Sequence, residues 1–231
     1  GNDTLIGNNS SNTLIGNAGD DLLEGGMGTD YLTGNAGDDT FTFKTSSETT
    51  GDYIDGGETD ETAGDRVDYS SVTNGVNVTL GEAGIETDVI ISNVNDHQIK
   101  DIEHVDGTNQ KDIITGNSED NTLKGNDEDD VLTGNAGNDE LYGGNNNDTL
   151  SGGAGNDLLD GGAGNDTVDY QNASEDLDVD ITDGTKFISA SQGTDTFKDI
   201  EGIIGGSGND KLTGNTGANT LIGNDGDDTL L

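Results

Sequence analysis

The chain has 231 residues, of which 27% are hydrophobic and 4% aromatic, and its 48 acidic against 8 basic residues give a formal net charge of −40. This profile is typical of a disordered chain, so a folded state needs a ligand that neutralises and crosslinks the carboxylates, as a divalent cation does. The sequence offers no basic cluster for a nucleic-acid partner, no run of about 18 apolar residues for a membrane span, and no cysteine for disulfides or thiolate metal sites.

Residues 1–42 repeat a unit of nine residues. A large apolar residue recurs at every ninth position from Leu5 to Phe41, Asp or Asn stands two places before it, and glycine usually fills the first and fourth places. Glycine permits a tightly turned backbone, and three residues of strand bury one side chain. The unit therefore predicts six turn residues and three strand residues. Two units form one coil of eighteen residues, and stacked coils share a thin core.

Residues 43–106 interrupt this pattern. Within them "GDYIDGG" (51–57) and "AGDRVDY" (63–69) resemble isolated units separated by four inserted residues. Further on, Val76, Val78 and Leu80 alternate with polar residues, as in a longer, half-buried strand. We interpret this segment as a wider coil that interrupts the stack without ending it.

The pattern then resumes at residues 107–169, is interrupted again at 170–204, and returns at 205–231. The two interruptions resemble each other, which indicates a duplication of about a hundred residues. The matching segments are residues 65–80 with 166–181 and residues 100–117 with 198–215. The predicted fold class is all-β, a parallel β-roll or β-solenoid of stacked 18-residue coils with two wider-coil interruptions.

The Asp or Asn two places before each large apolar residue is the sixth residue of the unit. Stacking places these sixth-place residues of successive coils side by side, where their carboxylates repel unless a cation lies between them. Calcium suits this place, because it binds six to eight carboxylate and carbonyl oxygens in a tolerant geometry. We therefore predict multiple Ca²⁺ ions, and nine of them would reduce the formal charge from −40 to −22. The predicted side-chain ligands are Asp3, Asn12, Asp21, Asp30, Asp39, Asp112, Asn121, Asp130, Asp139, Asp148, Asp157, Asp166, Asp210 and Asp228. The predicted backbone ligands are the turn glycines Gly16, Gly19, Gly25, Gly28, Gly34, Gly37, Gly134, Gly137, Gly143, Gly152, Gly155, Gly161, Gly164, Gly205, Gly208, Gly214 and Gly217.

Glu103 and Glu201 stand at the sixth place where the pattern resumes after each interruption. The half-coils before them, "QIKDIE" (98–103) and "TFKDIE" (196–201), lack glycine. In one interpretation they therefore cannot curl their carbonyls inward, and each Glu reaches an ion held mostly by the following turn, which carries Asn121 or Asn219. In the other, both Glu side chains are solvated and no ion binds there.

The nine-residue unit resembles the repeats-in-toxin (RTX) family, whose haemolysin-type calcium-binding repeat is written G-G-x-G-x-D-x-U-x with U a large aliphatic residue. "GGAGNDLLD" (152–160) matches it at every defined place. The resemblance implies a parallel β-roll that folds on binding calcium, in proteins exported by type I secretion and folded outside the cell.

The predicted function is calcium binding and calcium-driven folding in an extracellular protein at the cell surface, without catalysis. His97 and His104 lie in no recognisable catalytic constellation, so surface or strand positions are expected for them. The chain then belongs to a structural or adhesive surface protein, with self-association or a cell-surface polysaccharide as possible partners. The alternative is a non-catalytic accessory module of a secreted enzyme or toxin, such as a hydrolase or a polysaccharide epimerase, that aids export and folding.

Overall fold

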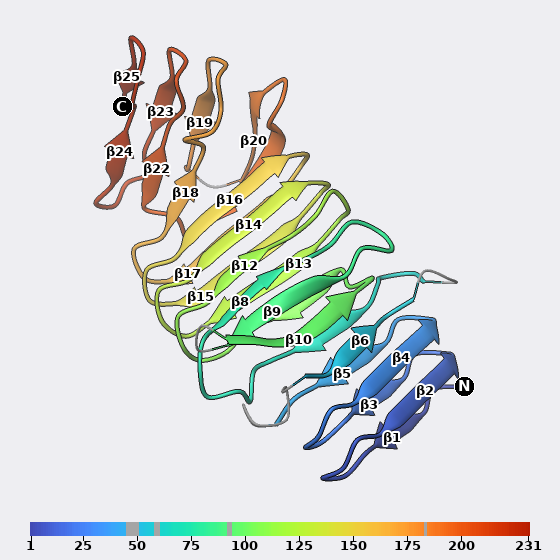
Figure 1. Ribbon diagram of the computed structural model, residues 1–231. Helices are drawn as coiled ribbons and strands as arrows, with labels where there is room; N and C mark the ends of the chain where they lie inside the picture. The colour runs from blue at the N-terminus through green and yellow to red at the C-terminus, as the bar shows by residue number, and fades with distance from the viewer. Residues whose placement is uncertain (45–50, 58–60, 92–93, 183) are drawn as a thin grey trace. The chain divides into compact units, whose positions relative to one another are not determined.

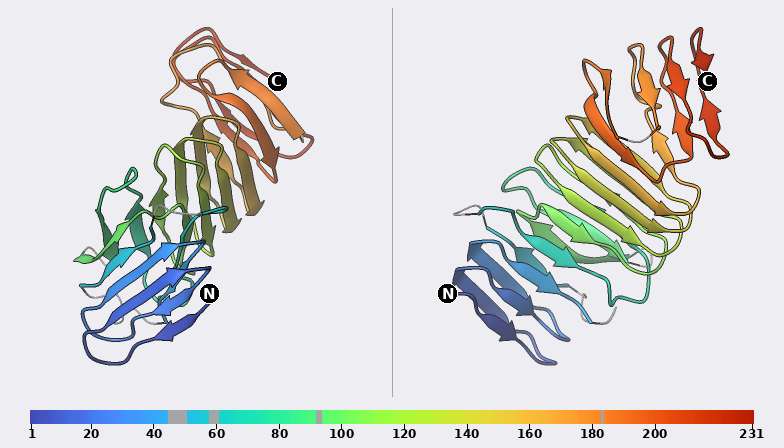
Figure 2. Two further views of the ribbon diagram at one scale, coloured as in Figure 1. Left: turned by 90° about the vertical axis from the view of Figure 1, so that its right-hand side faces the viewer. Right: turned by 180° about the vertical axis from the view of Figure 1, so that it is seen from behind.

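The computed structural model describes residues 1–44, 51–57, 61–91, 94–182 and 184–231, and all its regular elements are strands. In these ranges no helix is long and apolar enough to cross a membrane. The chain divides into two compact units, the first from Gly1 to Asn117 and the second from Ser118 to Leu231. Within each unit the parallel strands lie one beside the next in separate layers (Figures 1 and 2).

The first unit begins with the predicted coils. Its strands are β1 (Thr4–Ile6), β2 (Thr13–Ala18), β3 (Leu22–Glu24), β4 (Tyr31–Ala36) and β5 (Thr40–Thr42). Odd-numbered strands pair in one sheet and even-numbered strands in the other, always parallel. Leu5 faces Leu23 and Leu14 faces Leu32, so each coil contains eighteen residues as predicted. Leu23 and Leu32 are fully buried because the central residue of each strand points between the sheets.

The first interruption keeps both sheets but inserts antiparallel strands. Its strands are β6 (Tyr53–Asp55), β7 (Arg66–Asp68), β8 (Val76–Thr79), β9 (Thr87–Ile91), β10 (Val94–Lys100), β11 (His104–Asp106) and β12 (Ile113–Thr115). β6 continues from β4 and β7 from β5 in parallel, but β9 pairs antiparallel with both β8 and β10. The expected wider coil is therefore partly a meander. Of the four expected inserted residues, 58–60 lie outside the described ranges.

The second unit contains the most regular coils. Its strands up to the second interruption are β13 (Thr122–Asn126), β14 (Val131–Ala136), β15 (Glu140–Asn145), β16 (Thr149–Ala154), β17 (Leu158–Ala163) and β18 (Thr167–Asp169). All pair in parallel with a step of one coil, as in the facing of Leu141 and Leu159. Leu123, Leu132, Leu141, Leu150 and Leu159 are all fully buried. The core is thus a single file of aliphatic side chains in each sheet.

The second interruption also contains an antiparallel pair. The remaining strands are β19 (Asp178–Asp180), β20 (Gly184–Ser189), β21 (Gly193–Lys198), β22 (Gly202–Ile204), β23 (Lys211–Thr213), β24 (Thr220–Ile222) and β25 (Thr229–Leu230). β20 pairs antiparallel with β21, which continues the sheet of β17, while β22 and β24 continue the sheet of β18. β19, β23 and β25 form a third parallel sheet. The all-β parallel β-roll is confirmed, and the division into five sequence segments stays a prediction.

Candidate metal sites

The sixth-place carboxylates form a ladder along the turn edge of each unit. In the pairs given below, the Oδ1 atom of the later aspartate accepts the backbone N–H of the sixth-place residue one coil earlier, with N···O distances of 2.7 Å for Asp39 and Asp21 and 2.9 Å for Asp157 and Asp139. The predicted pairs joined in this way are 3/21, 12/30, 21/39, 121/139, 130/148, 139/157, 148/166 and 210/228. The ninth pair, Asp112 and Asp130, has one member in each unit.

The second oxygen of several ladder carboxylates is buried. In seven aspartates that are at most 3% exposed, no hydrogen-bond donor in the described ranges reaches Oδ2. They are Asp21, Asp30, Asp39, Asp65, Asp139, Asp157 and Asp166. Burial raises the pKa of Asp39, Asp157 and Asp166 to about 6 and that of Asp139 to about 7. A buried carboxylate oxygen is costly unless positive charge meets it, so this row of atoms fits bound cations.

The first-place glycines explain how such an oxygen meets further ligands. A side chain on Gly134 would collide with Asp139 Oδ2 and would come within 2.6 Å of the Gly152 carbonyl oxygen. A carboxylate oxygen and a carbonyl oxygen therefore border one small space that only glycine leaves open. The same relation to Oδ2 holds for Gly16, Gly25, Gly34, Gly143, Gly152 and Gly205, whereas a side chain on Gly161 would meet Cβ and Cγ of Asp166. A space bordered by oxygens alone suits a hard cation such as calcium.

The fourth-place glycines serve close stacking of the coils. A side chain on Gly155, where φ is +153°, would overlap the carbonyl of Gly137 in the preceding coil. Gly19, Gly28, Gly37 and Gly137 also have positive φ and back onto the preceding coil, and Gly164 and Gly208 face its backbone too. Near Gly217 the closest group is the Asn215 side chain, and near Gly214 it is the Asn219 amide. These positions meet backbone or amide groups rather than a carboxylate Oδ2 atom.

Two predicted ligands, and one asparagine at the same place in the repeat, are already satisfied by the protein. Asp112 accepts hydrogen bonds from the backbone N–H groups of Val76 and Thr108, one on each oxygen. Its counterpart Asp210 accepts likewise from Leu177 and Gly206. The Asn219 amide donates to carbonyls of its own turn, where an ion would otherwise bind. These residues are therefore weaker candidates than the seven aspartates described above.

Glu103 and Glu201 join the ladder, and each accepts a backbone N–H from the preceding coil. Glu103 Oε2 accepts the Asp65 N–H at 2.7 Å, and Glu201 Oε2 accepts the Asp166 N–H at 3.0 Å. The expectation that the glycine-free half-coils cannot turn their carbonyls inward is wrong. Asp101 adopts φ 52° and Asp199 adopts φ 51°, a left-handed conformation that aspartate tolerates better than most residues. Their carbonyl oxygens lie beside Gly56 and Gly161, close to Asp65 and Asp166.

Sequence reasoning missed three ladder residues inside the interruptions. Asp52, Asp65 and Asp195 accept the backbone N–H groups of Asp30, Asp39 and Asp157 at 2.7, 2.6 and 3.1 Å. Each stands two places before a buried apolar residue, namely Ile54, Val67 and Phe197. That spacing was visible in the sequence, but the surrounding insertions removed the nine-residue phase.

A second ladder, also missed, runs along the exposed fifth places. Here the earlier side chain accepts from the later coil: Asp120 Oδ1 accepts the Asn138 N–H at 2.6 Å, and Asn138 Oδ1 accepts the Asn156 N–H at 3.1 Å. Asp129 and Asn147 repeat the arrangement in the alternate half-coils. The signal was the Asp or Asn that directly precedes most sixth-place residues.

Asp195 differs from its neighbours because a tyrosine supplies the missing donor. The Tyr170 hydroxyl donates to Asp195 Oδ2 at 2.7 Å, and both residues are buried. Burial still raises the pKa of Asp195 to about 7. The hydroxyl thus satisfies the oxygen that no described donor reaches in the seven aspartates above.

We expect Tyr170→Phe to lower the free energy of unfolding by about 1–3 kcal/mol, because a buried carboxylate oxygen loses its only described donor. Urea unfolding in saturating calcium measures this. Tyr142→Phe is the matched control, since that hydroxyl binds an exposed Glu140 carboxylate and should cost less than about 0.5 kcal/mol. Equal effects of the two substitutions would contradict the role given to Tyr170.

The two histidines lie on strands, but neither is at the surface. His97 on β10 is 3% exposed, and its Nε2 lies 2.5 Å from the buried Tyr69 hydroxyl. Burial lowers the pKa of His97 to about 3, so its ring is neutral at physiological pH. His104 on β11 is 8% exposed and contacts the Ala63 carbonyl through Nε2. The expectation of surface or strand positions is confirmed, since both histidines lie on strands.

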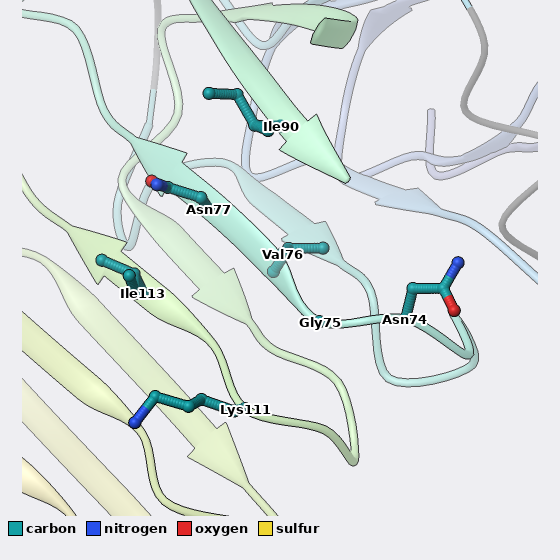
Figure 3. A pocket seen from close by; sticks show the side chains of 7 residues that line it. All are labelled: Asn74, Gly75, Val76, Asn77, Ile90, Lys111 and Ile113. Carbon is teal, nitrogen blue, oxygen red and sulfur yellow. The ribbon is translucent and has the colours of Figure 1, made fainter. Parts of the chain in front are cut away.

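A hollow of about 380 Å³ beside β8 offers different chemistry from the turn edge (Figure 3). Its lining residues are Asn74, Gly75, Val76, Asn77, Ile90, Lys111 and Ile113. Amide, apolar and lysine side chains provide neither a carboxylate ligand nor an acid–base pair. The hollow is therefore separate in kind from the cation sites.

Comparison with known families identifies the repeat. The model of the RTX calcium-binding nonapeptide repeat matches the chain in four copies, at residues 1–32, 106–141, 142–171 and 203–231. No curated protein matches the chain. The four copies cover more than half of the chain and include most of the ladder aspartates.

Proposed function

Because the chain belongs to the RTX calcium-binding nonapeptide repeat family, we propose that it is a module of a type I-secreted protein that folds on binding calcium outside the cell. The observation that carries this proposal is the row of buried Oδ2 atoms that no donor in the described part of the chain reaches, and glycine carbonyls border this row. In the proposed sites Asp21, Asp30, Asp39, Asp139, Asp157 and Asp166 supply carboxylate oxygens, and the first-place glycines supply carbonyl oxygens. The calcium ions supply the positive charge that joins successive coils.

We further propose that the module is non-catalytic and belongs to a structural or adhesive protein of the cell surface. Its acids support this proposal, because they recur with the coils and are used in hydrogen-bond ladders rather than in one unique constellation. Catalytic acid pairs, by contrast, occur once at a defined cleft. The exposed fifth-place ladder offers amide and carboxylate groups on which another chain or a polysaccharide could dock.

Asp148 provides a direct test of calcium binding by the ladder. Its Oδ1 accepts the Asp130 N–H and its own N–H binds Asp166, so it contributes to two successive steps. We expect Asp148→Asn to raise the calcium concentration at the folding midpoint about tenfold, since one charged ligand becomes neutral while the side chain keeps its shape. Calorimetric titration and circular dichroism measure the change.

Asp178→Asn is the matched control for that substitution. Asp178 is exposed on β19 and pairs with Lys211 at 2.8 Å, an interaction worth at most about 1 kcal/mol. This substitution removes one negative charge, as Asp148→Asn does, but at a position away from the ladder. The calcium midpoint should therefore change little. If both variants shift the midpoint equally, general electrostatic attraction rather than ladder ligation explains calcium binding.

A further inference from the structure

Three carboxylates converge where the first interruption rejoins the roll. Glu61, Asp65 and Glu103 each have an oxygen within 4.8 Å of the other two. Asp65 is fully buried, and its Oδ1 accepts the Asp39 N–H, but no donor in the described part of the chain reaches its Oδ2. The Asp101 carbonyl oxygen lies beside that atom, where a side chain on Gly56 would be. A carboxylate with a buried, unsatisfied oxygen thus lies within 4.8 Å of two further acids.

The short segment that carries Glu61 is held firmly in place. The Asp38 carboxylate accepts hydrogen bonds from the Thr62 hydroxyl at 2.6 Å and from the backbone N–H groups of Thr62, Ala63 and Gly64 at 2.8 to 3.2 Å. These bonds, the Thr62 hydroxyl first, lower the pKa of Asp38 well below its ordinary value. On the other side, the His104 ring contacts the Ala63 carbonyl. These contacts of Thr62, Ala63 and Gly64 therefore hold the neighbouring Glu61 near the ladder.

We infer that Glu61, Asp65 and Glu103, together with the Asp101 carbonyl, form a three-carboxylate calcium site that binds more tightly than the two-carboxylate steps. Every donor is an oxygen, which suits calcium. Calcium–oxygen distances of about 2.3–2.6 Å allow opposite ligands to lie up to about 5.2 Å apart, which accommodates the cluster. The inference rests on the proposed function, because it assumes that the ladder binds calcium, and it adds a ligand that the nonapeptide does not contain.

The second unit contains a natural comparison. There Glu201 accepts the Asp166 N–H and the Asp199 carbonyl lies beside Gly161, as Glu103, Asp101 and Gly56 do in the first unit. Among the described residues, however, Glu61, Asp65 and Glu103 are the one group of three acids that meets the same spacing. The places where the two interruptions rejoin the roll, here called seams, thus differ by one carboxylate. We expect their calcium affinities to differ accordingly.

The test follows the release of ions from the folded, calcium-saturated chain. Free calcium is lowered stepwise with a chelator buffer, bound ions are counted by native mass spectrometry, and amide signals of Gly56, Gly64 and Asp65 are followed by NMR. In the wild type these amides should be among the last to change. In Glu61→Gln they should change at a free calcium at least tenfold higher. Glu86→Gln, which alters an exposed glutamate of the same unit, should leave them unaffected.

Each outcome has a distinct meaning. If the wild type binds no calcium, the proposed function fails. If the wild type binds calcium but Glu61→Gln releases the ion at the same concentration, the three-carboxylate site is wrong while the proposed function stands. Should Glu61→Gln not fold, Glu61→Asp keeps the charge and withdraws it by one methylene. Its release concentration should then lie above that of the wild type, and an unchanged value overturns the inference.

Discussion

Removing calcium with a chelator should unfold the β-roll. Sixth-place carboxylates are stacked in register in successive regular coils, and at least seven of them bury an oxygen that has no donor in the described ranges. Leaving one such charge buried and uncompensated costs several kcal/mol, which a core of one aliphatic side chain per strand cannot offset many times over. We expect loss of the β signal in circular dichroism. We also expect expansion toward the roughly 50 Å radius of gyration of an unfolded chain of this length.

Refolding on calcium addition should be cooperative, because each coil is stable only against its neighbours. A midpoint near 10⁻⁴–10⁻³ M is expected for a module that folds outside the cell. Magnesium at the same concentration is the control and should not restore the fold, since it demands a stricter octahedron. Native circular dichroism in excess chelator, or a midpoint below about 1 μM, would contradict calcium-driven folding outside the cell.

Without calcium, the stability of any remaining folded state should fall as pH rises from about 5 to 8. Burial raises the pKa of Asp39, Asp157 and Asp166 to about 6 and of Asp139 and Asp195 to about 7, against an ordinary value of 3.8. The folded state therefore binds more protons than the unfolded state over this range. The stability that these protonated aspartates contribute is fully present below the ordinary pKa of 3.8 and is lost as the pH passes the raised pKa values.

Calcium should reverse this dependence, because it replaces the protons on the same carboxylates. Calcium affinity should rise with pH over the same range, with protons released on binding. Urea unfolding in chelator and calorimetry in buffers of different protonation enthalpy measure the two effects. A calcium-free stability that is flat or increases between pH 5 and 8 would show that the ladder aspartates are charged in the folded state.

The regular coils were predictable because every contact in them repeats at eighteen residues. The buried positions of Leu132, Leu141 and Leu150 and the pairing of Asp139 with Asp157 follow from that period alone. The antiparallel pairs β8–β9 and β20–β21 were not predictable, because their partners depend on how the inserted segments fold back. In the same way, no local pattern indicates that Tyr170 binds Asp195.

The site at the first seam shows a further limit of periodic reasoning. Glu103 was recognised because it stands at the sixth place, but Glu61 lies in an insertion that has no phase. Its position depends on Asp38, which binds the neighbouring residue Thr62. Likewise, the left-handed backbone of Asp101 replaces a glycine that sequence reasoning expected to be essential.

The two ladders give the stack a modular growth rule. Between regular coils, a sixth-place side chain of the later coil accepts a backbone N–H of the earlier one. A fifth-place side chain of the earlier coil accepts a backbone N–H of the later one. The two ladders have opposite polarity, so the interfaces between regular coils have the same complementary hydrogen-bond donors and acceptors on their two faces. An eighteen-residue coil inserted between two regular coils would meet matching hydrogen-bond donors and acceptors on both sides. The length of such a domain can therefore change by whole coils through duplication and deletion, while the hydrogen bonds at the remaining interfaces stay the same.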